Sequence, residues 1–437
     1  MLKFNQLINN NEELDIINKL SILFFSLLPI SILVGNAAIN LNILIINLIF
    51  LVYCFKFKIW GWLKSRMFLA LLFLYFFLIT NSIYSFFFII ENETGGIVRS
   101  ILFIKFILLV FAFSKLSEKH IVLNKIKTNW LIIILIVIID IFYEKYFGKN
   151  IIGFVSPNPQ RVISFFKDEM VVGGYVLCFG FSTITYFLSQ SKRNKSLLFF
   201  LIVFLIVPIS IFMTGERSNF IKSALLFIAI AIFLNHKKFN FNLKYLVPLF
   251  FLIISSFIYL NDNIKDRYSV FFKRILVVEK NKHFLEKFEN IKYFAHFDTA
   301  IKIFKKYPIS GVGNKNFRKE CSKKIYFEEK IKFSAQRCST HPHQIHFEIL
   351  SELGIIGYLY IISFMIIFLF KNIKIFMRTQ NISHLSNISY MVLFFLPLLP
   401  GAGIFSTFNG SIFWIIFSLT YLTYKKEHLN LKKKILQ

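Results

Sequence analysis

Twelve apolar stretches of about 15 to 24 residues constrain what this chain can fold into. A helix that crosses a bilayer needs about 20 mainly apolar residues, because the hydrocarbon core is about 30 Å thick. Of the 437 residues, 56% are hydrophobic, which is unusual for a water-soluble domain of this size. The stretches cover residues 20–35, 37–55, 67–90, 98–114, 130–147, 170–190, 196–213, 218–235, 245–260, 346–370, 385–400 and 410–424. The sequence therefore predicts an all-α polytopic membrane protein with about twelve transmembrane helices, and it excludes a soluble enzyme.

The basic residues indicate how the chain crosses the membrane. There are 51 Lys and Arg against 23 Asp and Glu, but the positive charges alternate with apolar stretches, so we expect no nucleic-acid partner. With a cytoplasmic N-terminus, the predicted cytoplasmic segments from residue 56 onward carry 22 Lys and Arg, and the four short segments on the other side carry 5. Short basic loops resist translocation. The asymmetry therefore predicts that both termini are cytoplasmic.

One long segment interrupts the series of predicted spans. Residues 261–344 form a loop of 84 residues with 19 Lys and Arg against 9 Asp and Glu, on the side opposite the termini. Loops of this length inside a compact protein are commonly functional. We expect a helical subdomain here, between a region of nine spans (1–260) and a last region of three spans and a cytoplasmic tail (345–437). Function is expected at the outer face.

A histidine stands where this loop re-enters the membrane. Pro342 is suited to the first turn of a helix, which would place His343 in that turn, beside backbone N–H groups that favour anions and disfavour a protonated imidazole. A neutral His343 could accept a proton from an attacking hydroxyl. The alternative is an interfacial histidine without a chemical role. His341, His343 and His346 do not share one helix face and lack completing ligands, so we expect no metal site and no cofactor.

Two arginines are candidates for binding phosphate. Arg217 is the single basic residue in a tight outer turn between two apolar spans, where an arginine needs a partner. Its planar fork binds phosphate oxygens bidentately; the alternative is a salt bridge with Glu216 or an arginine that reaches the interface. Arg161 precedes the sixth span and could add a second phosphate contact, with Glu169 orienting it. The alternative for this pair is an ordinary ion-rich membrane edge.

The four cysteines give no metal-binding pattern and no disulfide scaffold. Cys321 and Cys338 lie in the long loop, on the predicted oxidising side, and are candidates for a disulfide. Cys54 and Cys178 lie within predicted spans and are expected to be buried packing residues.

Together these residues resemble the O-antigen ligase family, which shares a domain with the O-antigen polymerases. The family motif is a His, then Asn, Ser or Gln, nine residues, a Gly, two residues and a small residue. Here His343 and Gln344 are followed by nine residues, then Gly354 and Gly357. The outer-turn arginine of the family matches Arg217, and the arginine before the sixth span is similar to Arg161.

The resemblance implies a metal-independent glycosyltransferase of the membrane-embedded GT-C type in the bacterial inner membrane. Its donor would be a glycan linked to undecaprenyl diphosphate, and its acceptor the lipid A–core oligosaccharide of lipopolysaccharide, at the periplasmic face. Arg217 and Arg161 would stabilise the charge that develops on the diphosphate. His343 would be the base.

Two other functions remain open from the sequence. A polymerase would use the same donor and add it to a growing glycan. A transporter of the lipid-linked glycan would be expected to place ionisable residues near the middle of the membrane. The ionisable residues evident within the predicted spans are Lys105, Asp140, Glu144, Lys145 and Lys222, and several of them lie near span ends. This distribution favours an enzyme over a transporter.

Overall fold

The computed structural model describes residues 2–90, 93–167, 169–191, 194–236, 245–276, 292–329, 331, 333–397, 399–401 and 403–436. These residues form helices and loops, with no β-strand in any of the described ranges. The predicted all-α architecture is therefore confirmed. In chain order the α-helices are α1 (Leu2–Ser26), α2 (Leu28–Val34), α3 (Asn36–Phe57), α4 (Arg66–Phe88), α5 (Gly95–Ile101), α6 (Ile104–Leu116), α7 (His120–Phe147), α8 (Val172–Gln190), α9 (Asn194–Met213), α10 (Arg217–His236), α11 (Leu246–Leu260), α12 (Asp262–Leu276), α13 (Lys292–Lys306), α14 (Phe317–Glu320), α15 (Ile345–Thr379), α16 (Ile382–Phe394) and α17 (Thr407–Leu436). Short 3-10 helices are η1 (Gly61–Lys64), η2 (Ser164–Phe166), η4 (Lys324–Tyr326) and η5 (Ser334–Gln336).

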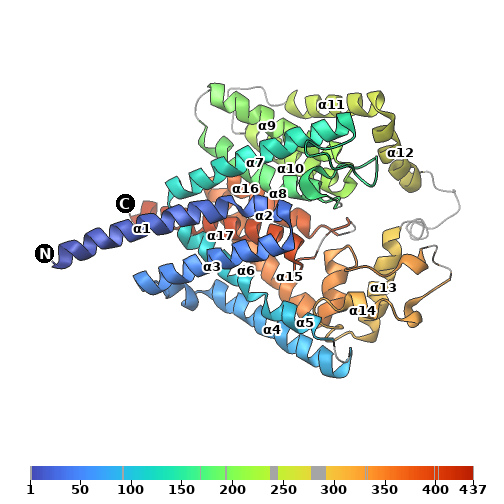
Figure 1. The fold of residues 1–437 in the computed structure, drawn as a ribbon, viewed down its shortest axis with the longest axis horizontal. Helices are drawn as coiled ribbons and strands as arrows, with labels where there is room; N and C mark the ends of the chain where they lie inside the picture. Colours follow the sequence, from blue (N-terminus) through green and yellow to red (C-terminus); the bar gives the residue numbers. More distant parts are fainter. Residues whose placement is uncertain are drawn as a thin grey trace.

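The long helices pack into a bundle that has two distinct ends (Figure 1). Both chain termini lie toward one end, on the left of the view. Helices α12, α13 and α14, which come from the long loop, lie at the other end. We call this second end the loop end.

The described residues contain fewer candidate spans than the sequence predicts. Among the described residues, nine helical segments are long and apolar enough to cross a membrane. A tenth is added if α11 and the first part of α12, bent by 108° at a short break, form one span. The predicted span 385–400 is replaced by α16, which has only 13 residues, or about 20 Å of helix. The stretch 410–424 lies within α17, where Ser411, Ser418 and Thr420 dilute its apolar character.

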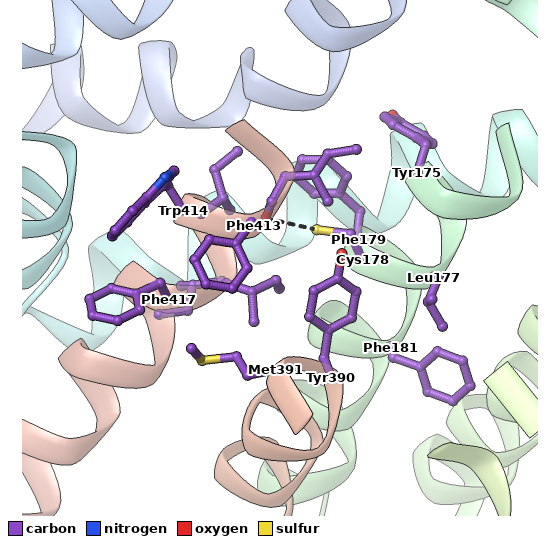
Figure 2. Packing of buried hydrophobic residues seen from close by; sticks show 14 of the residues in the cluster. Tyr175, Leu177, Cys178, Phe179, Phe181, Tyr390, Met391, Phe413, Trp414 and Phe417 are labelled. Carbon is purple, nitrogen blue, oxygen red and sulfur yellow. Dashed lines mark hydrogen bonds between the residues drawn. The ribbon is translucent and has the colours of Figure 1, made fainter. Parts of the chain in front are cut away.

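Aromatic side chains fill the centre of the bundle. Figure 2 shows part of this core, with Phe413 and Trp414 of α17 on one side and Tyr175 and Phe179 of α8 on the other. The ring centroids of Phe413 and Trp414 are 5.3 Å apart, at 87° to each other, an edge-to-face arrangement that aromatic pairs favour. The thiol of Cys178 donates to the carbonyl of Ile412 at 3.8 Å. Cys178 is buried and free in the structure, as is Cys54.

Helix α15 breaks at Gly354, and the break attaches the long loop to the bundle. Gly354 has φ 64° and ψ −168°, a region of the backbone that is essentially reserved for glycine. The break leaves the carbonyls of Ser351 and Glu352 open to other partners. The N–H groups of Val312 and Gly313 donate to them at 2.9 and 2.8 Å. The first two turns of α15 are thereby fixed to residues 311–313.

The loop has a small hydrophobic core of its own. It comprises Ala300, Ile303, Val312, Phe317, Cys321 and Tyr326, with Cys338 and Phe347 packed against it. Cys321 and Cys338 are disulfide-bonded in the structure. This core lies beside the start of α15, and it gives the loop a fixed shape next to His343.

Replacing Gly354 by alanine should destabilise the protein strongly. A Cβ atom at this position would lie 2.2 Å from the carbonyl oxygen of Ile309, in addition to the strained backbone geometry. We expect a loss of stability of at least about 3 kcal/mol, at the upper end of single substitutions. The apparent melting temperature of the purified variant in detergent measures it.

A matched control separates the clash from backbone strain. Gly148 also has a positive φ, 75°, but a Cβ there would meet nothing within 4 Å. Gly148→Ala should cost only about 1 to 2 kcal/mol, the penalty of a left-handed residue. Equal losses for the two variants would show that the contact between Gly354 and Ile309 is unimportant.

Candidate active site

His343 lies just before α15, with φ 58° and a half-buried side chain. The sequence placed it within the first helical turn, which is wrong because the helix begins at Ile345. Gln344 is the N-cap, and its side-chain oxygen accepts from the N–H groups of His346 and Phe347 at 2.7 and 3.1 Å. Gln344 therefore fixes the start of α15, directly after His343.

Aromatic and polar side chains of the long loop surround the His343 ring. Its Nε2 lies 3.1 Å from the hydroxyl oxygen of Ser339. The ring centroids of Tyr293, His296 and His341 lie 5.4, 5.1 and 4.3 Å from that of His343. The long loop thus supplies most of the walls around the candidate base.

The neighbouring histidines have fixed roles. Burial and the nearby Lys315 ammonium lower the pKa of His341 to about 3, so this ring is neutral at physiological pH. The Nδ1–H of His296 donates to the carbonyl of Arg337 at 2.8 Å. His346 bridges the Tyr358 hydroxyl and the Phe395 carbonyl, which makes it a structural residue. Across the described ranges, no three His, Cys, Asp or Glu are grouped in a way that could hold a metal ion.

Lys315 joins the long loop to α15 through buried charges. Its ammonium contacts Glu348 at 2.5 Å, and its backbone N–H donates to Glu352 at 2.8 Å. Burial lowers the pKa of Lys315, but the two carboxylates outweigh burial and raise that pKa above its ordinary value. A buried ion pair is expensive to break. The cluster therefore holds residues 311–317 firmly against the helix that follows His343.

Arg217 is the first residue of α10, at the loop end of the bundle, and is half-buried. The adjacent Glu216 is buried and accepts from the Gly173 N–H at 2.7 Å and from the Asn219 amide at 2.6 Å. Glu216 therefore braces the start of α8 against α10. This brace fixes the turn that presents Arg217.

Pro400 and Gly401, which lie between α16 and α17 and are not helical, connect the turn at Arg217 to His343. The hydroxyl of Ser218 donates to the carbonyl of Pro400 at 2.6 Å. The N–H of the next residue, Gly401, donates to the carbonyl of His343 at 2.7 Å. His343 and Ser218, the residue after Arg217, are thus held by consecutive residues of one segment. The sequence analysis did not predict this connection, because it assigned residues 385–400 to a continuous span.

Two further arginines lie around the same turn. A guanidinium nitrogen of Arg161 donates to the Met170 carbonyl at 2.5 Å, and the Nε of Arg267 donates to the Gly215 carbonyl at 3.1 Å. The positive charges of Arg217 and Arg161 both act on Arg267. Arg161, Arg217 and Arg267 therefore form one cluster, which we call the arginine cluster.

Arg267 was missed by the sequence analysis. It lies on α12 among the 19 basic residues of the long loop, where no pattern singles it out. The structure also links it to the histidine, because Arg267 interacts electrostatically with Tyr293, whose ring contacts His343. One sequence feature could have marked Arg267 as a site residue. It lies just after the predicted ninth span, where the long loop begins.

Glu169 differs from expectation, whereas Gly357 has the packing role that a small residue suggests. The side chain of Glu169 is exposed and, among the described residues, forms no ion pair with Arg161; the carboxylate that acts on Arg161 is that of Glu216. Gly357 packs against Phe77 of α4, where a Cβ would lie 2.9 Å from the ring. Gly354 and Gly357 therefore serve helix geometry and packing.

The site combines an imidazole with several guanidinium groups at the loop end of the bundle. Positively charged groups arranged in advance stabilise negative charge best where water is partly excluded. The arrangement is suited to bind an anionic leaving group beside a proton acceptor. It includes His343 and Arg217, which the sequence singled out, and it adds Arg267.

Comparison with known proteins gives one family match, in the part of the chain that carries most of the candidate site residues. Residues 201–362 match the family described as O-antigen ligase. The matched range contains Arg217, Arg267 and His343, whereas Arg161 precedes it. No curated protein matches the chain. Residues 201–362 of this multi-pass membrane protein are therefore similar to the O-antigen ligase family.

Proposed function

We propose that this chain transfers a glycan from undecaprenyl diphosphate to a hydroxyl group of lipid A–core oligosaccharide, in lipopolysaccharide biosynthesis. The observation that carries the proposal is the pair of hydrogen bonds made by residues 400–401. Pro400 accepts from Ser218, and Gly401 donates to His343. These bonds bring a proton acceptor and the arginine cluster to the same end of the bundle, as glycan transfer from a diphosphate requires.

The proposed reaction is a single displacement. The acceptor oxygen forms a bond to the anomeric carbon of the donor, the bond from that carbon to the diphosphate oxygen breaks, and the acceptor proton moves to His343. When Nε2–H of His343 donates to Ser339, Nδ1 carries the lone pair that a base requires. Arg217, Arg161 and Arg267 stabilise the negative charge that grows on the departing diphosphate.

The proposal includes independence from metal ions. Three guanidinium groups can neutralise much of the charge of a diphosphate, a role that divalent cations fill in other phosphate sites. Transfer should therefore proceed equally well in EDTA.

The proposed orientation places the loop end of the bundle in the periplasm. Its support is the distribution of Lys and Arg between the short segments. Both termini would then be cytoplasmic, and the protein would lie in the inner membrane, where the lipid-linked donor is present.

Reconstitution tests the proposed function. Purified protein in detergent or nanodiscs is incubated with a defined undecaprenyl-diphosphate glycan and with lipid A–core, with and without EDTA. We expect glycosylated lipid A–core and free undecaprenyl diphosphate under both conditions. Absence of transfer with an intact, folded protein would reject the ligase assignment.

Polymerisation of lipid-linked repeat units is the alternative, because it uses the same donor and the same type of site. The family match does not distinguish the two reactions. A deletion strain does distinguish them. Loss of capped lipopolysaccharide with long lipid-linked chains retained indicates a ligase, whereas core carrying a single repeat indicates a polymerase.

A further inference from the structure

The ionisable side chains buried within the spans differ in one respect. Lys127 donates to the carbonyl and hydroxyl of Ser182 at 3.2 and 2.6 Å. Asp140 accepts from the Ile151 N–H at 2.8 Å, and Glu144 accepts from the Ile163 N–H at 3.0 Å. Lys222 of α10 is only 6% exposed, and within the described part of the chain its ammonium forms neither a hydrogen bond nor a salt bridge. Among the ionisable side chains buried in the described spans, Lys222 is therefore the one without a partner in the protein.

Lys222 lies next to the segment that joins the two halves of the proposed site. A Cβ atom on Gly401 would be 3.7 Å from the Lys222 ammonium nitrogen, and the Gly401 N–H is bonded to His343. One helical turn before Lys222, Ser218 is bonded to Pro400. Five residues separate Lys222 from Arg217, about 7.5 Å along the helix axis. Lys222 therefore lies farther along α10 than Arg217, away from the loop end.

Burial of an ammonium without a partner is unfavourable, because the charge loses its hydration. If this position only stabilised the fold, a hydrophobic side chain would stabilise it more than an unpaired lysine does. An anionic ligand that reaches Lys222 from the arginine cluster would offset the cost. The charge and the depth together select an anion that enters the membrane.

The same face of α10 continues into an apolar groove. Ser218, Lys222, Leu225 and Ala229 follow one another at spacings of four, three and four residues, so they share one helix face. Leu225 and Ala229 line a cavity of about 350 Å³ between α10, α15 and α16. Ile373 and Met377 of α15 and Val392 of α16 line its other sides. Along this face of α10, positively charged residues near the loop end are therefore followed by apolar residues that line the cavity.

We propose that Lys222 binds the phosphate nearest the lipid in a polyprenyl diphosphate, and that the groove below it holds the first isoprenoid units. The inference rests on the proposed function and specifies how the donor lies in the site. The arginine cluster contacts the phosphate that bears the glycan, Lys222 contacts the other phosphate, and the chain follows the Leu225 face of α10. Lys222 thus positions the donor so that its anomeric carbon faces His343.

Binding measurements with two probes test this assignment. Purified wild type, Lys222→Met and Lys127→Met are titrated with undecaprenyl diphosphate and with undecaprenol, which lacks phosphate. We expect Lys222→Met to raise the Kd for the diphosphate about 10-fold or more, the range of one charge-assisted contact. Its Kd for undecaprenol should not change. Lys127→Met, a buried lysine already bonded to Ser182, should match wild type with both probes.

Two further variants complete the test. Lys222→Arg keeps the charge and should retain diphosphate binding within a few-fold. Leu225→Trp fills the groove and should weaken binding of both probes, because it removes space for the chain. Ligand-free Lys222→Met should melt no lower than wild type, since it removes a charge without a partner in the protein.

The outcomes separate this inference from the proposed function. Wild-type protein that does not bind undecaprenyl diphosphate would contradict the proposed function itself. Wild-type binding together with an unchanged Kd for Lys222→Met would overturn only the assignment of Lys222. A Lys222→Met variant that fails to fold, while Lys127→Met folds, would also overturn it, because Lys222 would then have a structural partner.

Discussion

Replacing His343 by alanine should abolish glycan transfer and leave expression, membrane insertion and donor binding intact. Proton transfer by a positioned side chain contributes about 100- to 10,000-fold to a rate. The half-buried ring lies outside α15, so its removal does not break a helix. Turnover of a defined undecaprenyl-diphosphate glycan measures the loss, and binding of undecaprenyl diphosphate shows whether the donor site persists.

His120→Ala is the matched control. His120 is exposed and is the first residue of α7. That variant should transfer glycan at the wild-type rate. Normal transfer by the His343→Ala variant would remove the assignment of His343 as the base. If the His343→Ala variant loses both donor binding and transfer, His343 supports binding of the donor instead.

Arg217→Lys should be nearly as damaging as Arg217→Ala, with a loss of about 100- to 1,000-fold in turnover, the effect of removing one donor from a preorganised site. Lysine keeps the charge but cannot offer two parallel N–H groups to a phosphate. The brace formed by Glu216 fixes where the chain presents this side chain, so a shorter or differently shaped donor group cannot be repositioned easily. Turnover of the lipid-linked donor is the measurement.

Arg378→Lys provides the comparison, because Arg378 is exposed in the last turn of α15 and far along the chain from the site. It should have wild-type turnover. A fully active Arg217→Lys variant would indicate that simple positive charge is sufficient at this position. The bidentate role would then be wrong, even if Arg217→Ala is inactive.

Local sequence patterns predicted much of the fold. Apolar length identified the long helices, because a bilayer imposes the same length on every span. It failed at residues 385–400, where α16 ends at Phe394 and the chain turns back toward His343. An apolar composition alone cannot show where a helix stops when the following residues are also apolar.

The site was predicted in part. His343 and Arg217 stood out because each is a polar residue at a boundary between a loop and an apolar stretch. Arg267 did not stand out, since it is one basic residue among many in the long loop. Glu169 stood near Arg161 in sequence, but Glu216, which is far from Arg161 in sequence, supplies the carboxylate that acts on it. Partners of this kind depend on how helices α8, α9 and α10 pack.

The sequence by itself determined that this is an all-α membrane protein with a large loop before its last helices, and it singled out His343 and Arg217. Hydrophobic length and residue type are local properties, so they can be read along the chain. Only the tertiary structure decided that His343 precedes its helix, that residues 400–401 bind His343 and the residue after Arg217, and that Arg267 and Lys222 lie near this connection. These relations join residues up to about two hundred positions apart, and they arise from packing and hydrogen bonds that no local pattern encodes.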